Sequence, residues 1–160
     1  MWGWVSWLKP VPCFGKLTII KMNTNQIGKI TELEVLLYIQ KLGYSVSIPF
    51  GDKDRYDQIW DIDGRLLRIQ VKTSHWTDEE HSCIEFKCES SSLRGSGTKN
   101  LKYSKTEIDY FATYWEGKCY LVPVEECSTK KKLRFKAPKT NISTCNFAKD
   151  YEVEEVLKRL

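Results

Sequence analysis

The sequence DQIWDIDGRLLRIQVKT, residues 57–73, decides the fold and carries the candidate chemistry. At its centre lies Asp63-Gly64, a dipeptide typical of a two-residue type I′ turn, because both central positions of that turn require positive φ. With these two residues as the loop, Asp57 lies opposite Gln70 on the partner strand. The stretch is therefore predicted to be a β-hairpin.

Alternation along the two predicted strands separates a core face from a polar face. The core face gathers the apolar side chains, namely Trp60, Ile62, Leu67, Ile69 and Val71. Directly opposed residues point to the same side of a sheet, so Asp57, Gln70 and Lys72 share the polar face at one end of the hairpin. An acid, an amide and an ammonium group are thereby brought together.

This polar cluster suits a divalent cation beside a phosphate. The Asp57 carboxylate and the Gln70 amide oxygen are hard oxygen ligands of the kind that Mg²⁺ prefers. Lys72 is placed to orient water or to stabilise negative charge on phosphorus. The alternative is a salt bridge between Asp57 and Lys72 on a solvated sheet face, which is the commoner explanation when the hairpin is considered alone.

Length and composition are those of one globular domain: 160 residues, of which 41% are hydrophobic and 29% are charged. No apolar run is long enough to span a membrane, so we expect no membrane partner. The six cysteines form no CxxC pair, and we expect reduced thiols and a cytoplasmic location. A formal net charge of +4 permits nucleic-acid binding without establishing it.

Residues 1–21 differ in character from the rest of the chain. Three tryptophans alternate ahead of two prolines, which interrupt regular structure. No basic segment precedes an apolar core, as it would in a signal peptide, and Met22 offers a second start. We interpret residues 1–21 as a disordered or non-native extension and residues 22–160 as a single domain. The alternative for the extension is a short aromatic strand or an oligomer contact.

Helical patterns are found before and after the hairpin. A helix is predicted over residues 24–42, capped by Asn23 or Thr24 and ended by Gly43, and its broad apolar stripe predicts that it is mostly buried. A second helix is predicted from the capping box at residues 104–107 to Gly117. A third is predicted over residues 151–160. Strands are predicted over residues 44–48, 83–88 and 118–124, the last as an addition to the same sheet.

Three segments carry candidate DNA-binding cations. The loop before the hairpin contributes Lys53 and Arg55. The Ser/Gly-rich segment 89–102 is either a flexible linker or a DNA-facing loop with Arg94, Lys99 and Lys102. The densest basic run contains Lys130, Lys131 and Lys132, for which a solvated face is the commoner explanation and phosphate contact fits equally well. A zinc cluster is not predicted, because no usual finger spacing is formed by His75, His81, Cys83 and Cys88.

The order of these features resembles the core of the PD-(D/E)XK nuclease superfamily. The resemblance rests on residues 28–32, 42–44, 55–57 and 68–73. Asp57 resembles the motif aspartate, Lys72 the motif lysine and Glu32 the helical glutamate. The superfamily usually has Glu or Asp where this chain has Gln70. A glutamine there is similar to the branch of group I intron-associated homing endonucleases, which residues 110–114 and 119–124 also resemble.

The resemblance implies an α/β fold with a central mixed sheet flanked by helices. It also implies sequence-specific, metal-dependent hydrolysis of phosphodiesters in double-stranded DNA. Asp57, Glu32, Gln70 and the Val71 carbonyl would hold Mg²⁺, or Mn²⁺ in its place, and Lys72 would stabilise the developing charge. The neutral Gln70 removes one negative charge and should weaken metal affinity.

Members of that branch resemble one another in forming homo-tetramers, so a dimer or tetramer is expected. Two other enzymes share the core, a Holliday-junction resolvase and a restriction-type nuclease. A DNA-binding module without catalytic activity is the non-enzymatic alternative.

Overall fold

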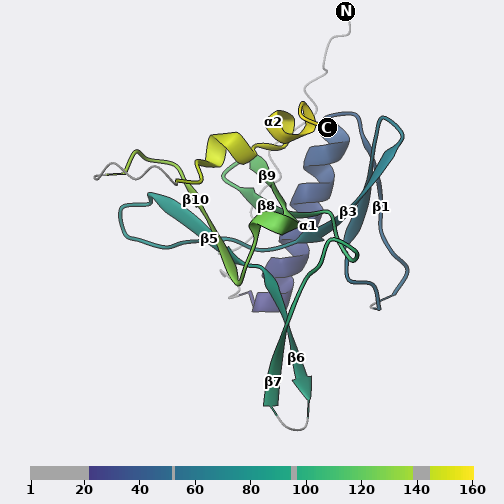
Figure 1. The fold of residues 1–160 in the computed structure, drawn as a ribbon, viewed down its shortest axis with the longest axis horizontal. Helices are drawn as coiled ribbons and strands as arrows, with labels where there is room; N and C mark the ends of the chain where they lie inside the picture. The colour runs from purple at the N-terminus through teal and green to yellow at the C-terminus, as the bar shows by residue number, and fades with distance from the viewer. Residues whose placement is uncertain (1–21, 52, 95–96, 139–144) are drawn as a thin grey trace, which may run out of the picture.

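Within residues 22–51, 53–94, 97–138 and 145–160, which a computed structural model describes, a five-stranded sheet forms the centre of the fold (Figure 1). In spatial order its strands are β1 (Ser45–Ser47), β2 (Gln58–Ile62), β3 (Arg65–Val71), β8 (Tyr110–Trp115) and β9 (Lys118–Pro123). The β3–β8 pair is parallel and the other three pairs are antiparallel. The predicted α/β fold with a central mixed sheet is confirmed, and β9 joins that sheet as expected. The extension 1–21 lies outside the described residues.

The β2–β3 hairpin forms with the predicted turn and register. Asp63 and Gly64 have φ values of 53° and 88°, as a type I′ turn requires. The Asp61 side chain accepts a hydrogen bond of 2.8 Å from the Gly64 amide and closes the turn. Trp60 pairs with Leu67, as a two-residue loop dictates.

Helix α1 (Thr24–Lys41) is capped as the sequence predicts. The Asn23 side chain accepts from the Gln26 amide and the Gln26 side chain accepts from the Asn23 amide, both at 2.9 Å. Gly43 follows the helix with a φ of 93°, a conformation that glycine adopts without strain.

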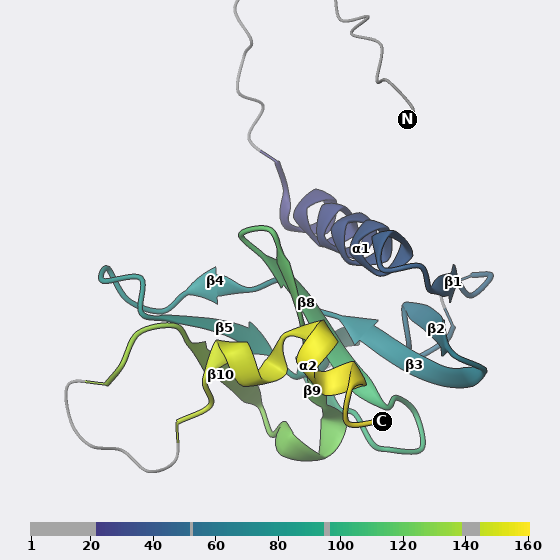
Figure 2. The same ribbon diagram turned by 90° about the horizontal axis from the view of Figure 1, so that it is seen from above.

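The prediction that α1 is mostly buried is wrong. Its buried residues are Thr31, Val35 and Ile39, whereas Leu33 and Leu37 are 62% and 52% exposed. The helix lies on one side of the sheet (Figure 2), so the sheet covers only one arc of its surface. Its exposed apolar residues form an outer stripe, consisting of Ile27, Ile30, Leu33 and Leu37.

Apolar side chains are buried on both faces of the central sheet. The first core lies between the sheet and the helices, where α2 (Val153–Leu157) joins α1, and includes Val35, Ile39, Trp60, Leu67, Ile69, Ala112, Leu121 and Val153. The second core lies on the opposite face and includes Ile84, Phe86, Phe111, Tyr120, Val122 and Leu133. Each fully buried side chain of this size contributes roughly 1.5–3 kcal/mol to folding.

A smaller three-stranded sheet covers the second core. Its strands, in order, are β10 (Lys130–Arg134), β5 (Cys83–Lys87) and β4 (His75–Trp76). The β5 strand agrees with the strand predicted over residues 83–88, whereas the β10 segment is predicted from sequence only as a basic run. Short 3₁₀ turns occupy Val124–Glu126 and Ala148–Tyr151, so the C-terminal helix is shorter than predicted. In the described part of the chain, no helix combines the length and the apolar character needed to cross a bilayer.

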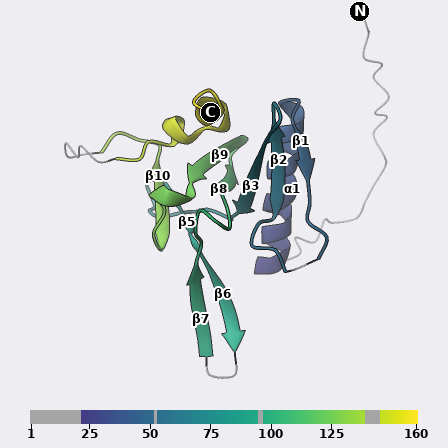
Figure 3. The same cartoon turned by 45° about the vertical axis from the view of Figure 1, so that its right-hand side comes forward.

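The segment interpreted as a linker or loop over residues 89–102 is a two-stranded ribbon. Strands β6 (Glu89–Arg94) and β7 (Gly97–Lys102) pair antiparallel along their whole length. The ribbon projects away from the body of the protein (Figures 1 and 3). We refer to it below as the β6–β7 ribbon.

The prediction of a helix after the capping box at residues 104–107 is wrong. One of the two bonds of the capping box forms, because the Glu107 side chain accepts from the Ser104 amide at 2.9 Å. The Glu107 amide donates to the Ser104 carbonyl and not to the Ser104 side chain. The chain then enters β8 instead of continuing as a helix. The segment YFATYW is rich in aromatic residues, which favour strands, and pairing with β3 and β9 overrides the helical spacing of its apolar positions.

Candidate active site

Asp57 lies at the start of the hairpin and is bound by the facing strand. Its amide donates to the Ile69 carbonyl at 2.8 Å. Its Oδ2 atom accepts from the Val71 amide at 2.7 Å and also from the Gln70 side-chain amide. The hairpin register therefore brings Asp57 and Gln70 into contact.

Gln70 is buried, at 8% exposure, on the face of β3 that the second core covers. Its partner across the parallel pair is Phe111 of β8. The salt-bridge alternative requires a solvated sheet face, and the burial of Gln70 does not fit that requirement. The Gln70 amide presents its nitrogen to Asp57, and a half-turn of that amide would present the oxygen instead.

Lys72 follows β3 and is held through both its backbone and its side chain. Its amide donates to the Ala112 carbonyl at 2.8 Å. Its ammonium nitrogen lies 3.3 Å from the Tyr103 hydroxyl and 3.5 Å from the Glu89 carbonyl oxygen. Burial lowers the pKa of Lys72, and the nearby charge of Asp57 opposes that shift.

Glu32 approaches Asp57 from α1. The two carboxylates line one cavity of about 220 Å³. The helix is fixed at this point because the Gln58 side chain donates to the Glu32 carbonyl at 2.8 Å and accepts from the Trp60 indole at 2.9 Å. The structure thus brings all four predicted catalytic residues to one end of the hairpin.

The surroundings of Glu32 and Asp57 disfavour the charged forms of both carboxyl groups. Burial raises the pKa of Glu32, and the charge of Asp57 raises it further, against the effect of Lys29. Burial also raises the pKa of Asp57, although the Val71 amide, Lys72 and Gln70 oppose it. Removing carboxylates from water without full compensation disfavours their charged forms, and a divalent cation would favour them again.

The donor set fits a hard divalent cation. In the described residues, no group of three or more His, Cys, Asp or Glu side chains is arranged to hold a metal. A metal site here would therefore combine the two acids with neutral oxygens, from the Gln70 side chain and the Val71 carbonyl. The Gln70 amide nitrogen contacts Asp57 and lies 3.4 Å from the Val71 carbonyl oxygen, so the Gln70 amide and that carbonyl are neighbours.

A family model described as PD-(D/E)XK endonuclease matches residues 22–154. The chain belongs to this family. The structure is also similar to that of a bacterial homing endonuclease, I-Ssp6803I, with a TM-score of 0.69 and 19% sequence identity. The similarity covers 86% of this chain and 95% of that one. At this identity it shows a common fold. A comparison with curated proteins gave no match.

The candidate DNA-binding residues of this PD-(D/E)XK endonuclease differ in their exposure and in whether they form ion pairs with acidic residues. Lys53 and Lys102 are exposed. Arg94 and Lys99 occupy positions on the β6–β7 ribbon. Arg55, in contrast, forms an ion pair of 3.0 Å with Glu107.

The basic run 130–132 is engaged in ion pairs along β10. Lys130 and Lys132 lie 2.6 Å and 3.6 Å from the Glu85 carboxylate. Lys131 is buried, and its ammonium lies 2.9 Å from the Glu126 carboxylate and 3.0 Å from the Tyr151 hydroxyl. Their contact with DNA stays a prediction, and these pairs reduce the effect expected from neutralising them.

Sequence reasoning missed Tyr103, which contacts Lys72 in this endonuclease. Tyr103 directly follows β7 and reaches the hairpin only because the ribbon folds back to its own base. No spacing or turn signal in the sequence connects residue 103 with residue 72. The only local signal for a functional role is that the aromatic Tyr103 follows the basic Lys102, and this signal is weak.

Proposed function

We propose that this protein is a divalent-metal-dependent endonuclease that hydrolyses phosphodiester bonds in double-stranded DNA. The observation that carries the proposal is the convergence of Asp57, Gln70 and Lys72 on one hairpin, beside Glu32 of α1. Membership of the PD-(D/E)XK endonuclease family supports the same chemistry.

Each of these residues has a distinct role in the proposed reaction. Asp57, Glu32, Gln70 and the Val71 carbonyl would hold Mg²⁺, or Mn²⁺ in its place. When bound, the cation supplies a Lewis acid for the scissile phosphate and lowers the pKa of the attacking water. Lys72 directs its ammonium charge at the oxygens on which negative charge develops. Gln70 contributes no charge, so the site should require more metal than one with a third carboxylate.

We further propose that cleavage is sequence-specific and of the homing type. The similarity of the fold to that of a bacterial homing endonuclease supports this proposal. So does the resemblance of residues 68–73 to the family motif, which puts Gln70 where the motif acid is usual. The β6–β7 ribbon also supports it, because a two-stranded ribbon has the dimensions of the DNA major groove.

A direct test is to incubate the purified protein with Mg²⁺ on a library of linear duplexes and, separately, on four-way junctions. Cleavage of a small subset of duplexes, abolished by EDTA, is the expected result. Preference for junctions would favour a resolvase instead. Binding of duplex DNA without cleavage in either Mg²⁺ or Mn²⁺ would contradict the enzymatic proposal.

The cations of the β6–β7 ribbon are expected to act through phosphates. Replacing Lys99 and Lys102 with Gln should weaken binding to all sequences and flatten the logarithmic dependence of affinity on salt by about 1.8, since each phosphate contact contributes about 0.9. The matched comparison replaces Lys130 and Lys132, whose charges are paired with Glu85, and should change the slope less. Fluorescence anisotropy over a salt series measures both slopes. A larger change for the β10 pair would reverse this assignment.

We propose that the protein acts as a homo-oligomer, and the outer stripe of α1 supports this proposal. Leu33 and Leu37 lie one turn apart and are both more than half exposed. Replacing them with Glu should reduce the mass measured in solution by light scattering to that of a smaller assembly and leave the circular dichroism spectrum unchanged. The matched control is Leu66→Glu, an equally exposed leucine at the hairpin turn. A wild-type protein that is monomeric at micromolar concentration would contradict the proposal.

A further inference from the structure

The ammonium group of Lys72 is held by the base of the β6–β7 ribbon. One contact comes from the carbonyl of Glu89, the first residue of β6. The other comes from the hydroxyl of Tyr103, which directly follows β7. A lysine ammonium has three N–H bonds, so these contacts engage two of them and leave one for a phosphate oxygen.

Tyr103 lies between two cations. The guanidinium carbon of Arg55 is 4.0 Å from the centre of the tyrosine ring, and the ammonium nitrogen of Lys72 is 4.9 Å from it. Both distances fall within the range of a cation–π interaction. Phe111 of β8 packs edge-on against the same ring, with centroids 5.3 Å apart, which limits its rotation. Burial raises the pKa of Tyr103, so its phenol stays neutral near pH 7 and can accept a hydrogen bond from Lys72.

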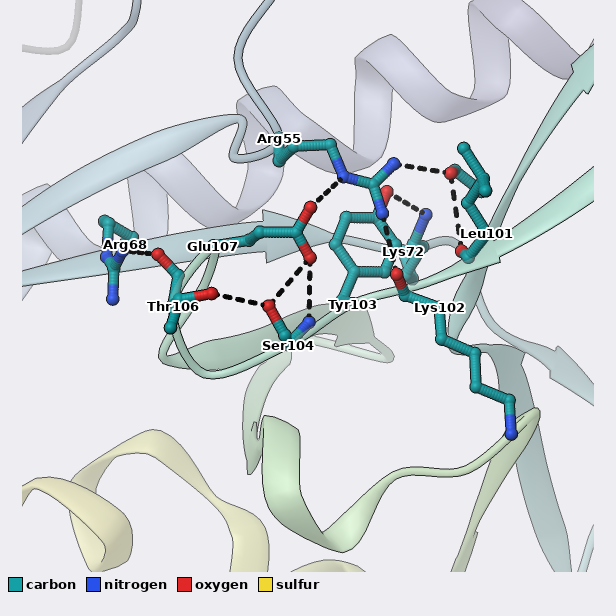
Figure 4. A network of polar contacts seen from close by, with 10 residues as sticks. Arg55, Arg68, Lys72, Leu101, Lys102, Tyr103, Ser104, Thr106 and Glu107 are labelled. Carbon is teal, nitrogen blue, oxygen red and sulfur yellow. Dashed lines mark hydrogen bonds and ion pairs between the residues drawn. The ribbon is translucent and has the colours of Figure 1, made fainter.

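Arg55 binds both strands of the ribbon at its base. Figure 4 shows Arg55 beside Glu107, Tyr103 and Lys102. It donates to the Ser90 hydroxyl on β6 at 2.7 Å and to the Lys102 carbonyl on β7 at 3.0 Å. Its Nε atom donates to Glu107 at 3.0 Å. Most donors of Arg55 are therefore used inside the molecule, where they hold the ribbon and Tyr103 in a fixed relation.

We infer that Tyr103 is a positioning residue for Lys72, and that Arg55 fixes Tyr103 in that role through the base of the β6–β7 ribbon. The inference rests on the proposed nuclease function and deepens it. The lysine assigned to the transition state is placed by the element that we propose contacts DNA. Tyr103 itself touches no reacting atom in this scheme.

The test measures the mobility of Lys72 directly, as the order parameter of its ε-methylene group from NMR relaxation of protein that carries 13C-labelled lysine. Tyr103→Phe keeps the ring and removes the oxygen that accepts from the ammonium. The Lys72 side chain then has one contact fewer, so its order parameter should fall. Tyr103→Leu also removes the ring and should produce a larger fall.

The matched control is Tyr38→Phe. Tyr38 is likewise partly buried, and its hydroxyl donates to Glu154 at 2.6 Å, on the side of the sheet covered by α1. This variant should leave the order parameter of Lys72 unchanged. In cleavage assays, Tyr103→Phe should lower kcat roughly three- to tenfold with KM unchanged, and should have no further effect when Lys72 is already Ala. Tyr38→Phe should leave kcat unchanged.

An order parameter of Lys72 that is the same in wild type and in both Tyr103 variants would overturn the inference, whether or not the protein cuts DNA. If the wild type does not cut DNA but the order parameter of Lys72 falls as expected, the proposed function fails and the positioning role stands. Should Tyr103→Leu fail to fold, as judged by circular dichroism, Tyr103→Phe decides the question because it keeps the packed ring.

Discussion

Lys72→Ala is expected to reduce the rate of DNA cleavage by a factor on the order of 10² or more, which is the loss seen when a positioned group that stabilises transition-state charge is removed. Folding should be preserved. Burial lowers the pKa of Lys72, so its charge costs stability in the folded protein, and removing it relieves that cost. DNA affinity measured in EDTA should change little, because the Lys72 ammonium is only one of several candidate DNA-binding cations.

The matched control for this variant is Lys105→Ala. Lys105 is exposed and forms a surface ion pair of 2.5 Å with Glu125, so its removal should affect neither cleavage nor melting temperature appreciably. Single-turnover cleavage and thermal melting of the two variants, measured in parallel, separate a catalytic effect from a structural one. Undiminished cutting by Lys72→Ala would remove the active site from this hairpin.

Asp57→Asn is expected to abolish metal-dependent cleavage and, in EDTA, to raise the melting temperature at neutral pH. The folded-state pKa of Asp57 is raised, so the folded protein binds the proton more tightly than the unfolded chain does. Stability contributed by this group is therefore greatest at low pH and is lost as pH rises through the folded pKa. Asparagine keeps the shape and avoids that loss, with a rise in Tm of about 2–4 °C for each kcal/mol recovered.

Asp109→Asn provides a control, because its expected effect on the melting temperature is opposite to that of Asp57→Asn. Burial would raise the pKa of Asp109, but hydrogen bonds from Arg68 outweigh burial and hold the pKa below its usual value. Its contribution to stability is present at neutral pH and lost as pH falls, so Asp109→Asn should lower Tm at neutral pH. Melting curves from pH 4 to pH 8 compare the variants. A Tm of Asp57→Asn that falls in parallel with that of Asp109→Asn, or retained cleavage, would contradict the assignment of Asp57.

The central hairpin could be predicted from sequence because its determinants are local. Asp63 and Gly64 set the turn, the turn sets the register, and the register brings Asp57 to Gln70. The cap of α1 was predictable for the same reason. These features depend on residues within a few positions of one another.

The parts that sequence reasoning missed depend on contacts between distant segments. Residues 108–115 have apolar spacing that fits a helix. Only pairing with β3 and β9 makes Tyr110–Trp115 a strand. The apolar residues of α1 predict a buried helix, but the single sheet beside it leaves the outer stripe exposed. Tyr103 reaches Lys72 through the base of a ribbon that the composition of residues 89–102 does not predict.

The parallel pairing of β3 with β8 also has an expected consequence for the order in which the site forms during folding. The β2–β3 hairpin closes over two residues and can form in about 1–10 μs, as isolated hairpins do. The strand that covers Gln70 and supplies the carbonyl for the Lys72 amide begins at residue 110, so a long loop must close before the parallel pair forms. A chain that has folded only as far as the hairpin contains Asp57, Gln70 and Lys72 but lacks β8. We therefore expect the Lys72 amide to find its acceptor on Ala112 only after the slower, long-range β3–β8 step.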